Sequence, residues 1–178
     1  MHERVEKILI NTEEIQEAIK KAGKWVDSEY KGKDLVLIGL LKGCLPFFGQ
    51  LISNISIDCI IDFMSVSSWK GKTTAQTLPL ITQGITENIK DKHVLLVDEI
   101  IDSALTLKYI REYLQEKYKP LSVEIITLLD KPMGRKVSLQ PIYKCFEIEN
   151  KFVVGYGCDY QGKLRNLPYV GIFKEEKE

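Results

Sequence analysis

Three carboxylates and two hydroxyls stand close together in one short segment of this 178-residue chain. An apolar run ends in Asp98 and Glu99. Asp102 follows three residues later, and Ser103 and Thr106 flank the start of a predicted helix. The first turn of a helix leaves backbone N–H groups unpaired at the positive end of its dipole, which suits a phosphate. The acids would repel a phosphate, so we expect them to face sugar hydroxyls, Mg²⁺ or a proton.

Two other interpretations of this segment are weaker. Asp102 or Ser103 could be an ordinary helix cap, but a cap needs only one such residue. An apolar strand ending in two acids also resembles part of a P-loop ATPase, with Gly71-Lys72-Thr73 upstream as the phosphate loop. That loop requires a glycine at position 66, where this chain has Val66, and no amphipathic helix follows it. We therefore reject the ATPase interpretation.

Four apolar runs of strand length follow one another along the chain, and leucine, isoleucine and valine dominate them. They barely alternate with polar residues, which is typical of parallel strands covered on both faces. The runs are Leu35–Ile38, Ile57–Met64, Val94–Val97 and Val123–Leu129.

Amphipathic stretches lie before and between these runs. The first begins at a capping box formed by Asn11 and Glu14 and ends near Gly32. A second runs from Pro46 to Ile52, and a third covers about residues 104–118. Strands and helices in this order predict an α/β fold with a central, mostly parallel sheet flanked by helices. Ligands of such sheets bind at the carboxyl ends of the strands.

Composition narrows the classes of partner. The 25 basic and 25 acidic residues cancel, so no overall field draws the chain to nucleic acid or to a membrane, and we expect neither as a partner. The charged amino-terminal segment lacks the apolar core of a secretory signal. The four cysteines are scattered without metal-ligand spacing, which predicts a reduced, cytoplasmic protein. The length corresponds to a single domain over residues 1–178.

The acidic segment resembles the phosphoribosyl-diphosphate (PRPP) motif of type I phosphoribosyltransferases, and residues 35–173 resemble the hypoxanthine-guanine branch of that family. Further family motifs occur in the correct order. They are Leu41-Lys42-Gly43 for diphosphate, Ser67-Ser68 at the start of a long loop, Leu129-Asp130-Lys131-Pro132 with Arg135 for purine recognition, and residues 151–160 with Arg165-Asn166-Leu167-Pro168 for covering the base.

The resemblance implies a type I phosphoribosyltransferase fold, in which a small hood from the terminal segments covers the strand carboxyl ends. It implies that ribose 5-phosphate passes from PRPP to hypoxanthine or guanine, giving IMP or GMP and diphosphate, with Mg²⁺ as cofactor. A homodimer or homotetramer is usual for the family. Two alternatives stay open: a xanthine-preferring salvage enzyme, and a regulator of the same fold that binds PRPP or nucleotide without turnover.

The resemblance also implies a role for each site residue. Asp102 is the general base or acid at purine N7. Lys131 donates to the 6-oxo group, while Phe152 and Val153 pack on the purine faces. Arg135 contacts either diphosphate or the protein itself. Lys42, Gly43 and Arg165 bind diphosphate, and the peptide bond before the lysine is often cis in the family. The residues that bind the 5-phosphate are Ser103, Ala104, Leu105 and Thr106. Asp98 and Glu99 bind ribose and Mg²⁺, and Asp159 binds a second Mg²⁺.

The chain departs from the family pattern in three ways. Asp98-Glu99 reverses the usual order of the two acids, Trp69 replaces a tyrosine in the long loop, and Ala104 replaces the glycine of the phosphate loop. Alanine starts helices well and avoids positive φ. We therefore expect Ala104 to be about the first residue of the helix, with right-handed dihedral angles and its methyl group beside the phosphate.

Overall fold

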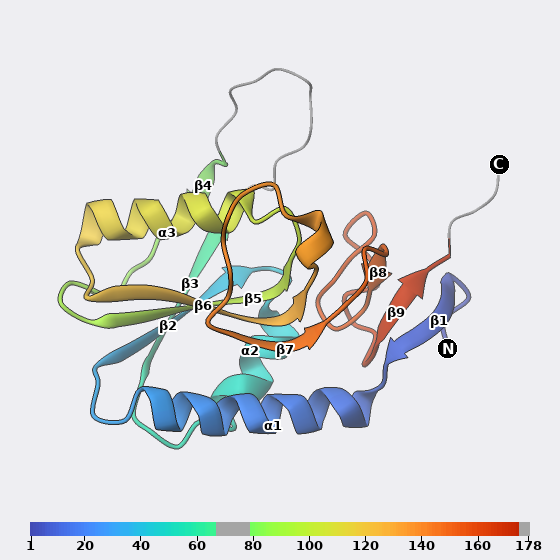
Figure 1. The fold of residues 1–178 in the computed structure, drawn as a ribbon, viewed down its shortest axis with the longest axis horizontal. Coiled ribbons are helices and arrows are strands. Elements are labelled where there is room, and N and C mark those ends of the chain that lie inside the picture. The colour runs from blue at the N-terminus through green and yellow to red at the C-terminus, as the bar shows by residue number, and fades with distance from the viewer. Residues whose placement is uncertain (67–78, 175–178) are drawn as a thin grey trace.

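The computed structural model describes residues 1–66 and 79–174 (Figure 1). The long loop opened by Ser67 and Ser68, with Trp69, lies outside the described residues. In chain order the helices and strands are β1 (Val5–Ile10), α1 (Thr12–Glu29), β2 (Leu35–Leu41), α2 (Leu45–Ile52), β3 (Ile60–Val66), β4 (Ile81–Gln83), β5 (His93–Ile101), α3 (Leu105–Tyr118), β6 (Ser122–Asp130), η1 (Pro132–Gly134), β7 (Tyr143–Glu147), β8 (Val153–Val154) and β9 (Val170–Phe173).

A six-stranded sheet forms the centre of the fold, in the order β4-β3-β2-β5-β6-β7. The neighbours from β3 to β7 pair in parallel, and β4 is the antiparallel strand at the edge. The predicted mostly parallel sheet is therefore confirmed. The carboxyl ends of the five parallel strands lie on one edge, from which the chain leaves β2, β5 and β6 into the segments that carry the candidate site residues.

Helices cover both faces of this sheet, with α1 and α2 on one side and α3 on the other (Figure 1). Alternate side chains of β2 separate the two cores, since Leu35 and Leu37 pack with α1 and α2 while Val36 and Ile38 pack with α3. Apolar residues on both faces explain why the strand runs do not alternate with polar residues.

The start of α1 follows the sequence prediction, because Asn11 and Glu14 form the capping box. The start of α3 does not. Ala104 has φ +63° and ψ 4°, so the expectation of right-handed dihedral angles is wrong. The carbonyl of Ala104 accepts the first helical hydrogen bond, from Lys108 N at 3.0 Å. The left-handed cap residue is where the chain changes direction from β5 into α3, and the conformation outweighs alanine's preference.

A second, three-stranded sheet, β1-β9-β8, forms the hood. Its strands are antiparallel and join the two ends of the chain, with Val5 opposite Phe173. Figure 1 shows this sheet beyond the edge at which α3 begins, so it stands at the carboxyl ends of the central strands. Within the described part of the chain, no helix is both long and apolar enough to span a bilayer.

Candidate active site

A cavity of about 340 Å³ opens at the carboxyl ends of β2 and β5, between the start of α3 and the hood. Its wall combines the apolar side chains of Leu40, Val66 and Ile110 with a polar floor. Many residues selected from the sequence come together there. They are Lys42, Gly43, Asp98, Glu99, Asp102, Ser103, Ala104, Thr106, Asp159 and Arg165.

The two adjacent acids lie within β5, which continues to Ile101, and not after the strand as the apolar run suggested. Burial raises the pKa of Asp98 well above its usual range, and the neighbouring charge of Glu99 raises it further. Burial also raises the pKa of Glu99, although Arg165 opposes this with a guanidinium nitrogen 3.8 Å from the Glu99 carboxylate. Two confined carboxylates with raised pKa values form a site that favours a cation.

The loop after β2 approaches these acids very closely. A Cβ atom on Gly43 would overlap the Glu99 carboxylate, so this position accepts only glycine without a rearrangement. The peptide bond Leu41–Lys42, just before it, is cis. On the hood side, a Cβ atom on Gly157 would overlap the Gly43 carbonyl oxygen. Gly157 has φ +105°, which also favours glycine.

The hood contributes an ion pair to the cavity wall. Arg165 Nη2 lies 2.6 Å from Asp159 Oδ1, and Arg165 Nη1 donates to the Gly157 carbonyl at 2.5 Å. The guanidinium therefore contacts both acids that could hold a metal on this side, Asp159 and Glu99. A cationic group beside the diphosphate loop can neutralise a departing anion.

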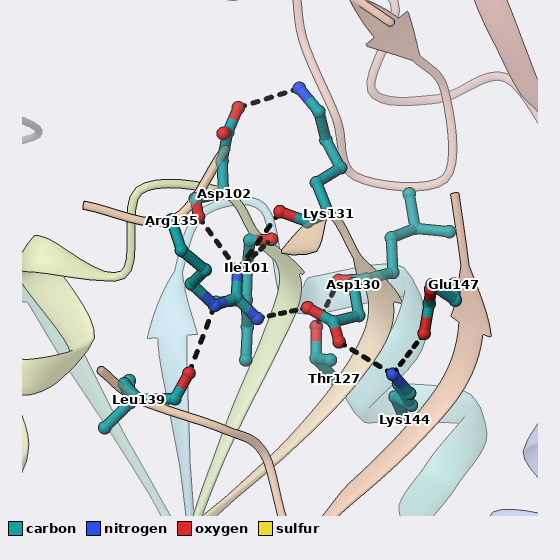
Figure 2. Close-up of polar contacts among 10 residues, drawn as sticks. Ile101, Asp102, Thr127, Asp130, Lys131, Arg135, Leu139, Lys144 and Glu147 are labelled. Carbon is teal, nitrogen blue, oxygen red and sulfur yellow. Dashed lines mark hydrogen bonds and ion pairs between the residues drawn. The ribbon is translucent and has the colours of Figure 1, made fainter. Parts of the chain in front are cut away.

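Asp102 and Lys131 come from neighbouring strand ends and form an ion pair of 2.8 Å (Figure 2). The Lys131 side chain is 8% exposed and that of Asp102 is 50% exposed, so the pair offers its carboxylate to solvent. Gly134 lies against this carboxylate, and a Cβ atom there would overlap Asp102 Oδ1. The pair sets an acceptor and a donor next to one another at the rim of the cavity.

The segment between β5 and α3 combines hydroxyl groups with the amino terminus of a helix, which suits an anion. Ser103 and Thr106 line the cavity, and the Leu105 N–H points back to Ser103 Oγ at 3.5 Å. Leu105 itself is not part of the cavity wall. Helix α3 has 14 residues, so its amino-terminal dipole is fully developed.

Four other selected residues lie outside the cavity wall, namely Lys131, Arg135, Phe152 and Val153. Phe152 is 48% exposed, and its ring lies in T-shaped contact with Tyr160 and Phe173 of the hood. Val153 is buried beside it. Of the two roles considered for Arg135, the contacts favour the protein over diphosphate, because its guanidinium binds Asp130 and backbone carbonyls (Figure 2).

Sequence reasoning missed the glycines that make room for these groups. Gly134 and Gly157 each border a functional residue that is distant in the sequence, so no local pattern marks them. Their only signal was membership of the purine-recognition turn and of the base-covering segment. It also missed that Asp102 and Lys131 pair directly.

Comparisons with known proteins agree on one family. The model of the phosphoribosyl transferase domain matches residues 5–161. A hypoxanthine-guanine phosphoribosyltransferase of Streptococcus pneumoniae is 46% identical over 172 residues, which cover 97% of this chain and 95% of the relative. A crystal structure of a Staphylococcus aureus hypoxanthine phosphoribosyltransferase is similar with TM-score 0.92 and 41% identity, covering 98% and 94% of the two chains. A structure named hypoxanthine-guanine-xanthine phosphoribosyltransferase has TM-score 0.88 and 32% identity, covering 98% and 100%.

Proposed function

The chain belongs to the phosphoribosyl transferase family, and we propose on that premise that it transfers ribose 5-phosphate from PRPP to N9 of hypoxanthine or guanine, releasing diphosphate. It is a purine salvage phosphoribosyltransferase, and thus a glycosyltransferase. The products are IMP and GMP. By the same resemblance, a homodimer or homotetramer is the proposed assembly.

The observation that carries the choice of substrate is the pair of Asp102 and Lys131, 2.8 Å apart. A 6-oxopurine presents its O6 acceptor next to N7 on one edge. An ammonium beside a carboxylate matches that edge, with Lys131 donating to O6 and Asp102 accepting the N7 proton. Adenine has an amino group at position 6 and would place a donor against the Lys131 cation, which costs binding energy.

Proton transfer follows from the same arrangement. When the base binds, two contacts with the purine replace the direct ion pair. Lys131 then contacts O6, and Asp102 contacts N7. As N9 attacks the ribose carbon, the base becomes more acidic, and Asp102 accepts the proton from N7. Such general base catalysis typically contributes about 10²–10⁴-fold. Phe152 and Val153 pack on the purine faces, and backbone carbonyls near Val153 and Asp159 meet a 2-amino group.

PRPP would lie along the cavity floor. Its 5-phosphate binds the backbone N–H groups and hydroxyls of residues 103–106, at the start of α3. Its diphosphate binds Lys42 and Gly43, with Arg165 closing the other side. The ribose hydroxyls face Asp98 and Glu99. The cationic side chains of Lys42 and Arg165 neutralise the charge that develops on the leaving diphosphate.

The acids also fit Mg²⁺. Within the described ranges, no group of three or more acidic, cysteine or histidine side chains forms a metal cage. The protein would therefore supply one or two carboxylates, from Asp98, Glu99 or Asp159, and the diphosphate would supply further oxygens. This division suits Mg²⁺, which prefers oxygen ligands and substrate phosphates. When bound, the ion supplies positive charge to the leaving group.

Initial rates with four bases test the proposal. We expect PRPP-dependent formation of IMP and GMP from hypoxanthine and guanine in the presence of Mg²⁺, and rates with adenine that are lower by about 100-fold or more. A faster rate with xanthine would instead support the xanthine-preferring alternative, since one structural neighbour carries xanthine in its name. Binding of PRPP without turnover of any base would support the regulator.

A further inference from the structure

Arg135 holds the backbone beneath the Asp102–Lys131 pair. Its side chain is 10% exposed. Arg135 Nη1 donates to the carbonyls of Ile101 and Asp102, both at 2.8 Å, and Nε donates to the Leu139 carbonyl at 3.1 Å (Figure 2). A single guanidinium therefore fixes the carbonyls on both sides of the Asp102 residue, which restricts the rotation of its backbone.

Further hydrogen bonds join the same two segments. Lys131 N donates to the Ile101 carbonyl at 2.9 Å, and Lys136 N donates to the Ser103 carbonyl at 3.0 Å. The turn after β6 is thus attached to the end of β5 on both sides of Arg135. Because Asp102 and Lys131 belong to these two segments, their relative position depends on the attachment.

A buried carboxylate keeps Arg135 in place. Asp130 is fully buried and binds Arg135 Nη2 through one oxygen and Lys144 Nζ through the other, at 3.0 Å. Lys144 also binds Glu147 at 2.5 Å, so its charge is shared. A buried carboxylate without its cation is costly. The guanidinium therefore remains in the protein and is not free to turn toward the diphosphate.

We propose that Arg135 is a positioning residue, which aligns the Asp102 carboxylate and the Lys131 ammonium for the N7 and O6 atoms of the base without touching substrate. This role rests on the proposed function. A lysine cannot replace it, because one ammonium lacks the planar fork that reaches Ile101, Asp102 and Asp130 together. Loss of alignment should affect the base and the proton transfer, and not the binding of PRPP.

Arg135→Lys keeps the charge beside Asp130 and removes the fork. We expect kcat/KM for hypoxanthine to fall by about 10–100-fold, while the Kd for PRPP, measured by calorimetry, changes by less than about threefold. Arg111→Lys is the matched control, since Arg111 makes an ion pair with Glu124 in which each side chain is 33% exposed. This control should keep the wild-type rate. Circular dichroism and PRPP binding verify the fold of both variants.

A double-mutant cycle separates positioning from general stability. With saturating base, kcat reports the proton transfer by Asp102 and not the binding contact of Lys131. If Arg135 acts on that step through Asp102, then Asp102→Asn combined with Arg135→Lys should have a kcat within about threefold of Asp102→Asn alone. Multiplied losses would overturn the proposal, as would wild-type kinetics of Arg135→Lys with only a lower Tm. Should Arg135→Lys not fold, Asp130→Asn weakens the hold on the guanidinium and must then lower kcat but not PRPP affinity.

The two proposals fail in different ways. An active wild-type enzyme with unchanged kinetics in Arg135→Lys contradicts the positioning role only. A wild-type protein that converts no 6-oxopurine contradicts the proposed function, and the positioning role with it.

Discussion

Ala104 is the residue whose conformation the sequence predicts least well. A left-handed conformation costs an alanine about 1–2 kcal/mol and costs glycine almost nothing. The buried methyl group, which packs against the α3 core, and the greater freedom of glycine in the unfolded chain offset part of that cost. We expect Ala104→Gly to leave the free energy of unfolding unchanged or to raise it by up to about 1 kcal/mol, or roughly 2–4 °C in Tm.

Ala22 provides the matched control for this variant. It is buried in the interior of α1, where glycine has no conformational advantage. Ala22→Gly should lower the free energy of unfolding by about 1 kcal/mol or more. Equal destabilisation in the two variants, measured by urea unfolding, would contradict a strained Ala104.

The Lys131 ammonium determines the choice of base in the proposed function. Lys131→Gln removes the ammonium that faces O6 and keeps a side chain that can accept from an amino group. We expect kcat/KM to fall by about tenfold or more for hypoxanthine and guanine, and the ratio of adenine to hypoxanthine use to rise. Lys136→Gln, an exposed neighbour in the same turn, should leave that ratio unchanged. An unmoved ratio in Lys131→Gln would mean that this lysine only supports the turn.

At the scale of elements, the site depends on close approach between the ends of β2 and β5. Gly43→Ala places a methyl group where the Glu99 carboxylate lies, so either the acid or the loop must move. We expect the KM for PRPP to rise by about tenfold or more, because both diphosphate and ribose contacts shift. Steady-state rates at varied PRPP and saturating hypoxanthine measure this change.

Gly49 is the control glycine, since a Cβ atom there meets no neighbour within 4 Å. Gly49→Ala lies in α2, where alanine is favoured, so stability should be equal or higher and the KM for PRPP unchanged. A normal KM in Gly43→Ala would show that the position of the Glu99 carboxylate is unimportant for PRPP.

The helices and strands differ in how well the sequence predicts them. The apolar runs and the capping box of Asn11 locate β2, β3, β5, β6 and α1, because period and caps are local signals. The two-residue strand β8 and the edge strand β4 are set by pairing with distant segments, and neither was predicted. The site followed the same rule: motifs identified Asp102 and Lys131, whereas their contact and the glycines around them depend on long-range packing.

For the whole molecule, the acids at the cavity floor make stability depend on pH. Burial raises the pKa values of Asp98 and Glu99 in the folded state, while the unfolded chain ionises both at ordinary values. At pH values between the unfolded-state and the folded-state pKa values, the folded state binds more protons than the unfolded state. These two groups therefore lower the free energy of unfolding as the pH rises. A difference of one unit between folded and unfolded pKa corresponds to about 1.4 kcal/mol.

Asp98→Asn removes one of these charges and keeps the shape of the side chain. Without metal or PRPP, we expect the variant to be more stable than the wild type at about pH 8, with the advantage shrinking toward about pH 4, where the wild-type acids are protonated. Urea unfolding of both proteins across this range measures the difference, in which titrating groups other than the coupled Glu99 cancel. Asp58→Asn, at an exposed position, is the control for the general effect of removing one acid. An Asp98→Asn advantage that grows toward low pH would mean that the acid is stabilised in its ionised form, as by a strong pair with Arg165, and not penalised by burial.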